Sequence, residues 1–63
     1  MFEVFLITFG ISLTGVEKVS EIPLGVGEEA RLLCEAQKHR KEFTAYVPQE
    51  YLTLGFTCEI RRI

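Results

Sequence analysis

The sequence has few of the residues from which catalytic and metal sites are built. Its 63 residues include one histidine and two cysteines. A zinc site usually draws on four such ligands at tight spacings, and nucleophilic catalysis needs a cysteine or serine with an oriented base. Cys34, His39 and Cys58 are scattered, and the first two fall on different faces of a predicted helix. We therefore expect no metal, no cofactor and no enzymatic activity.

The chain also lacks a charge excess and a long apolar run. Its formal net charge is −2, whereas non-specific nucleic-acid binders are usually clearly basic. The apolar N-terminal stretch is shorter than the ~20 residues of a membrane span, and it has no basic region typical of a signal peptide. We therefore expect no membrane association and a cytoplasmic location. With no repeat or linker, residues 1–63 are expected to form a single domain.

The N-terminal stretch 1–13 dominates what the chain does contain. Read as a strand, its odd positions form one apolar face: Phe5, Ile7, Phe9, Ile11 and Leu13. The even positions are apolar only in the first half: Phe2, Val4 and Leu6. A strand with two apolar faces must be covered on both. We therefore expect the odd face to be the core face, and we assign Phe2, Val4 and Leu6 to a self-association surface of a possible homodimer.

The rest of the chain predicts a small α+β fold. Thr14-Gly15 is typical of a tight turn, with a positive φ available to Gly15, and the charged, proline-containing run 16–24 is typical of an edge strand. Residues 28–40 have the periodicity of a helix, 43–47 form a possible short strand, and 56–63 alternate as a half-buried strand. We therefore expect an antiparallel sheet of three to four strands with one helix packed on one face, in the order β-β-α-(β)-β.

The two cysteines are open to two interpretations. Cys34 on the helix and Cys58 on the last strand can both face the helix–sheet core and so lie close together. Buried free thiols are the expectation for a cytoplasmic protein, and a disulfide is the alternative.

Two basic clusters provide a candidate partner-binding surface. Lys38, Arg40 and Lys41 lie at the end of the predicted helix, and Arg61 and Arg62 lie in the last strand. If they share one side of the molecule, they are suited to an acidic protein surface or to phosphates, with aromatic contacts from Tyr46 and Tyr51. The alternative is a solvated charged surface.

Several short stretches carry a resemblance to a known family. The run Glu21-Ile-Pro-Leu, the helix GEEARLLCEAQ, Tyr46-Val-Pro and the ending GFTCEIRR resemble the small phage-encoded inhibitors of bacterial RNA polymerase. The resemblance implies a short sheet with one helix and a last strand whose arginines bind the polymerase. Arg62 matches one of those arginines, whereas Ile60 takes the place of the other. The pair of cysteines also resembles that of small prophage proteins.

These observations lead to two functional hypotheses. The first is a non-enzymatic protein-binding module of phage or prophage type that inhibits or modulates a host protein, with RNA polymerase as one candidate. The alternative is a nucleic-acid-binding accessory protein that uses the basic clusters at the helix end and the C-terminus, with an affinity that falls steeply with salt.

Overall fold

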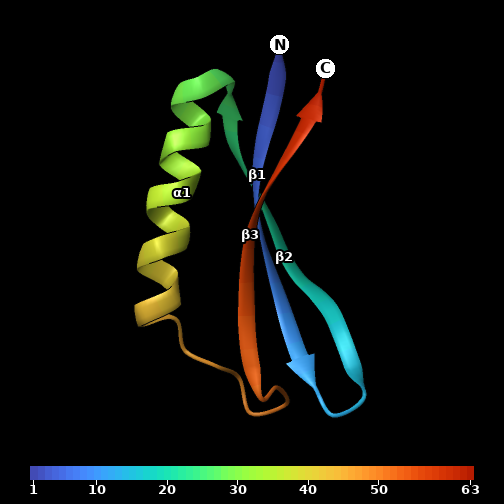
Figure 1. Ribbon diagram of the computed structural model, residues 1–63. Helices are drawn as coiled ribbons and strands as arrows, with labels where there is room; N and C mark the ends of the chain where they lie inside the picture. The colour runs from blue at the N-terminus through green and yellow to red at the C-terminus, as the bar shows by residue number, and fades with distance from the viewer.

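The chain folds as one three-stranded antiparallel sheet with a single helix on one face (Figure 1). The computed structural model describes residues 1–63. The central strand β1 (Phe2–Ser12) lies between β2 (Gly15–Val26) and β3 (Thr53–Arg62), and the helix α1 (Gly27–Thr44) connects the two outer strands. This arrangement confirms the predicted small α+β fold with three strands and one helix.

The hairpin of β1 and β2 turns where the sequence predicted it. Leu13 and Thr14 form the turn. Gly15 has a backbone φ of 139°, a value that residues with a Cβ rarely adopt. The hydroxyl of Ser12 accepts a hydrogen bond from the backbone N–H of Thr14 at 3.3 Å. The turn is therefore stabilised locally, and it fixes where the two strands begin to pair.

The two outer strands pair with β1 in different ways. The pairing with β2 shifts register twice, between Val4 and Phe5 and between Thr8 and Phe9. The pairing with β3 runs without a shift, and each β1 residue from 2 to 11 has one partner. Thus β2 is an irregular edge strand, whereas β3 is a regular one.

The helix is longer than predicted, and the expected strand 43–47 does not form. Phe43 and Thr44 belong to α1, and the backbone N–H of Ala45 donates to the carbonyl of Lys41 at 2.9 Å. No residue between 41 and 44 interrupts a helix, and the first strong breaker is Pro48. Phe43 and Thr44 therefore extend the helix, whereas residues 45–47 belong to the connection that leads to β3. Charged side chains occur throughout α1, which is not apolar enough to cross a membrane.

The core lies between α1 and the first half of β1. Val4 and Leu6 have no exposed surface, and they pack with Ala30 and Cys34 of the helix. The partly buried Phe2 packs against this cluster. The helix therefore covers the face that the sequence assigned to self-association, and that assignment of Phe2, Val4 and Leu6 is corrected. They form the core face, because the even positions of β1 point toward the helix.

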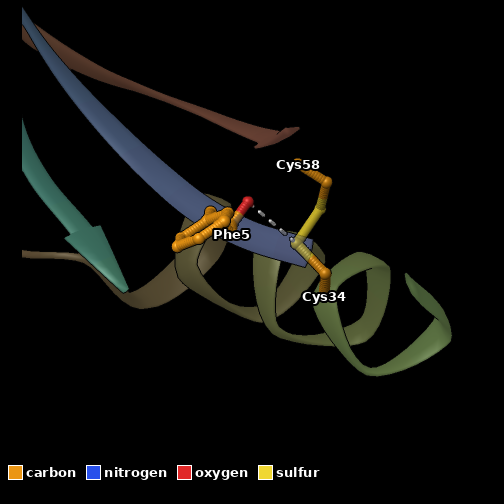
Figure 2. The surroundings of a disulfide bond; sticks show 3 residues. All are labelled: Phe5, Cys34 and Cys58. Carbon is orange, nitrogen blue, oxygen red and sulfur yellow. Dashed lines mark hydrogen bonds between the residues drawn. A yellow bond between two sulfur atoms is a disulfide. The ribbon is translucent and has the colours of Figure 1, made fainter. Parts of the chain in front are cut away.

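A disulfide ties the helix to the outer strand β3. Cys34 and Cys58 are joined across 24 positions of sequence, with their Cα atoms 6.1 Å apart (Figure 2). The expectation that both face the helix–sheet core is confirmed, whereas the expectation of free thiols is wrong. The Sγ of Cys34 also lies 3.8 Å from the carbonyl oxygen of Phe5. A disulfide sulfur carries no proton to donate, so we interpret this approach as a packing contact.

Candidate protein-binding face

The sheet surface away from α1 has no element packed on it, and we call it the open face. Cys58 is bonded to the helix and is paired with Leu6, so the even positions of β1 lie on the helix side. The odd positions therefore lie on the other side, and they form an apolar row along the centre of the open face: Phe5, Ile7, Phe9 and Ile11. From the sequence, we expected this row to form the core face, but the helix covers the opposite face of the sheet.

Polar side chains border the apolar row on both sides at its middle. Ile7 is paired with Glu21 on β2 and with Thr57 on β3. Phe5 is paired with Glu59 on β3, and its side chain is half-buried. Ile7 is only 3% exposed, although no other layer covers it. An apolar centre inside a polar rim is the usual composition of a protein-binding surface.

Arg61 lies across this face and connects its three strands. Its guanidinium carbon is 4.2 Å from the centroid of the Phe5 ring, within the range of a cation–π interaction. The same guanidinium forms ion pairs with Glu59 on β3 and with Glu21 on β2. Exposed ion pairs contribute about 0–1 kcal/mol each. Arg61, predicted to contact a partner, is thus already engaged by groups of its own chain.

The molecule is thin for its mass. Its principal extents are 38 × 22 × 11 Å, and 7 of its 63 residues are buried. The accessible surface is 4617 Å², compared with about 4,100 Å² expected for a compact monomer of this mass. The excess is consistent with a structure of two layers in which one broad face is uncovered.

Tyr51, one of the two tyrosines predicted to contact a partner, packs on the helix side of the sheet. A Cβ placed on Gly10 would lie 2.6 Å from Cζ of Tyr51, so the ring rests directly on the backbone of β1. The Tyr51 hydroxyl donates a hydrogen bond to the Glu17 carboxylate, and this bond raises the pKa of Tyr51 above its ordinary value. Tyr51 is therefore a packing residue. Tyr46 is 85% exposed and remains available for contact.

The structure does not bring the two basic clusters together. Arg61 lies at the N-terminal end of α1, because Glu3 pairs with both Arg61 and Val26, the residue before the helix. Lys38 follows Gly27 by 11 positions, which corresponds to about 17 Å along the helix axis. Figure 1 shows the C-terminus and the last turn of the helix at different ends of the molecule. Lys38, Arg40 and Lys41 therefore lie toward the C-terminal end of α1, while Arg61 and Arg62 lie near its N-terminal end.

The sequence reasoning missed Phe5 and Phe9 as surface residues. The alternation in β1 showed that their face is apolar, but it carried no information about which face the helix covers. One signal was present: Gly10, in the middle of a strand, is typical of a close approach by another part of the chain. Placing Tyr51 over Gly10 would have identified the even face as the covered one.

Comparison of the chain with protein-family models, with curated proteins and with solved structures finds no match.

Proposed function

We propose that the protein is a non-enzymatic protein-binding module that docks on its partner through the open face. The observation that carries this proposal is the row of half-buried Phe5, Phe9 and Ile11 along the centre of the open face, on which no other element of the chain packs. Apolar side chains at the centre of such a surface supply most of the binding free energy once a partner excludes water from them. The polar rim, with Arg61, Glu59 and Glu21, supplies orientation and specificity.

We propose further that the partner is a host protein and that the module is of phage or prophage type. The support is the resemblance of its short motifs to the small phage-encoded inhibitors of bacterial RNA polymerase. The structure adds that Arg61 and Arg62 stand on opposite faces of β3, as their alternation requires. Arg62, the residue that matches an arginine of those inhibitors, lies on the helix side of the sheet. Arg61 borders the open face, and we assign Arg61 to partner binding together with the apolar row.

The compartment in which the partner is found decides whether the disulfide between Cys34 and Cys58 persists. Disulfides form and persist in oxidising environments and are rare in the cytoplasm. A polymerase target implies that the protein acts with Cys34 and Cys58 reduced, or that it acts before reduction. Binding should therefore be measured with the disulfide intact and after reduction.

The test is binding of purified bacterial RNA polymerase by the whole chain and by two matched variants. Phe9→Lys places a charge in the centre of the open face, and Leu32→Lys makes the same change on the outer surface of α1, where Leu32 is 56% exposed. We expect Phe9→Lys to weaken binding by at least tenfold, which corresponds to about 1.4 kcal/mol, and Leu32→Lys to leave it unchanged. Circular dichroism of each variant verifies that the fold is retained.

The two parts of the proposal fail separately. If the unmodified chain does not bind the polymerase, the polymerase is not the partner, and the variants are compared on proteins captured from a bacterial lysate. Equal binding by Phe9→Lys and Leu32→Lys to any captured protein excludes the open face as the docking surface.

A further inference from the structure

The outer edge of β3 has hydrogen-bonding groups that no part of the chain satisfies. β3 is an outer strand and pairs only with β1. The backbone N–H of Ile63 donates to the carbonyl of Met1 at 3.2 Å, in line with the register of the two strands, so odd-numbered residues of β3 bond toward β1. Before β3 begins, the N–H of Leu52 donates to the carbonyl of Ile11 at 2.7 Å, so this alternation applies from Thr53 onward. Because bonding direction alternates along an antiparallel strand, the outward N–H and C=O groups belong to the even-numbered residues: Leu54, Phe56, Cys58, Ile60 and Arg62.

The two edges of the sheet differ in their protection. Edge strands that avoid pairing with other chains usually contain bulges, proline or lysine. β2 has all three, with two register shifts, Pro23 and Lys18. β3 has ten residues, an uninterrupted register and neither proline nor lysine. Only β3 is therefore suited to receive another strand.

We propose that a second copy of the chain pairs with this edge, β3 against β3 in antiparallel orientation about a two-fold axis at Cys58. This register is the one that pairs all five outward-facing residues. It places Phe56 opposite Ile60 of the partner subunit, an aromatic and β-branched pair of the kind that stabilises sheets. Glu59 stands opposite Thr57 of the partner subunit, and Arg61 opposite Gly55 of the partner subunit. No two like charges are directly opposed, and the exposed side chain of Ile60 becomes covered.

The helix leaves room for this arrangement. α1 packs against all three strands, so its axis lies inside the β3 edge. With strands about 4.8 Å apart, each helix axis is at least about 5 Å from the two-fold axis, and the two helices lie on the same side of the sheet at least about 10 Å apart, which is enough to avoid a clash. The six-stranded sheet has the order β2-β1-β3-β3-β1-β2. Both of its outer edges are the protected β2, so the assembly closes at two copies.

Solution mass and amide hydrogen exchange test the proposal together. Light scattering over a concentration series should reach twice the chain mass of 7.2 kDa. In the dimer, the amides of Phe56, Ile60 and Arg62 should exchange slowly, and their protection should rise with protein concentration. The amides of Thr57 and Glu59, which bond to β1 in either state, serve as internal standards.

Two variants with the same substitution complete the design. Ile60→Lys on β3 should raise the dimer dissociation constant by at least tenfold, because it places a charge opposite Phe56 of the partner subunit. Val19→Lys on β2, where Val19 is 44% exposed compared with 51% for Ile60, should leave it unchanged. A monomer at every concentration, or an Ile60→Lys variant that dimerises as well as the parent, would overturn the proposal. A dimer in which the even-numbered amides of β3 exchange freely would also overturn it, and would place self-association on the open face.

Discussion

Reduction of the disulfide should remove a large part of the stability of this fold. The bond between Cys34 and Cys58 spans 24 positions of sequence. In the chain-entropy description, closing a loop of this length in the unfolded state stabilises the native state by about 3.5 kcal/mol. The apolar core of a domain of this size rarely supplies more than about 3–5 kcal/mol, so the disulfide contributes about as much as the core. Loss of about 3.5 kcal/mol should lower the ratio of folded to unfolded chain by about 400-fold.

Urea unfolding of the oxidised and the reduced chain measures this difference. Far-UV circular dichroism is a suitable signal because the helix and all three strands contribute to it. We expect the free energy of unfolding to fall by about 3.5 kcal/mol and the melting temperature by about 25 °C. Alkylation followed by mass measurement verifies that both thiols are free in the reduced sample only. A fall of less than about 1 kcal/mol would show that the apolar core alone holds the helix on the sheet, and it would refute the loop-closure reasoning.

Three further predictions concern single residues. Gly10→Ala should lower the free energy of unfolding by about 1–3 kcal/mol in urea, because the added Cβ overlaps the Tyr51 ring. Gly55→Ala is the control: no atom lies near the added Cβ, so the free energy of unfolding should change by less than about 0.5 kcal/mol. The folded-state pKa of Tyr51 is raised by its hydrogen bond to Glu17. This bond therefore contributes stability below about pH 10, and the contribution is lost as the pH rises through the folded-state pKa. In a pH series of unfolding curves, Tyr51→Phe should remove this loss of stability at high pH. Leu6→Ala should cost about 2–5 kcal/mol in the same assay, because Leu6 is fully buried; a change in solution mass without loss of stability would instead favour a self-association role.

The parts of the fold that the sequence predicted are those fixed by local chemistry. Thr14-Gly15 between two β-prone runs determined the hairpin, since few residues other than glycine adopt the required φ. The alternation in 56–63 and the charge distribution of the helix determined the other elements. In each case the relevant interactions lie within a few residues of one another, so a short window of sequence contains them.

The misplaced features depend on contacts between distant parts of the chain. Both faces of β1 are apolar near its start, so periodicity alone could not decide which one the helix covers. That choice follows from the pairing of Leu6 with Cys58, 52 positions away, and from the approach of Tyr51 to Gly10. The strand predicted at 43–47 failed for a related reason. Its β-prone residues need a neighbouring strand to pair with, and the existing helix instead continues through Phe43 and Thr44.

The prediction of free thiols failed for a different reason. It rested on an expected compartment and not on geometry, although the geometric part, that Cys34 and Cys58 both face the core, was correct. A core cluster of four buried residues is small for a chain of 63. Small domains of this kind often depend on a covalent cross-link. The size of the chain was therefore a better guide to the cysteines than the default location.

The two proposed surfaces are compatible with each other for a geometric reason. Pairing β3 with β3 about an axis perpendicular to the sheet keeps both helices on one side and both open faces on the other. The apolar rows of the two copies then belong to one continuous six-stranded surface, and neither is covered by the dimer contact. A partner that carries two matching sites would be engaged at two points, and the second contact would gain from the first because it is intramolecular. Face-to-face dimerisation would instead bury the surface assigned to the partner. Measurement of β3 amide protection therefore also decides whether the open face is free for another protein.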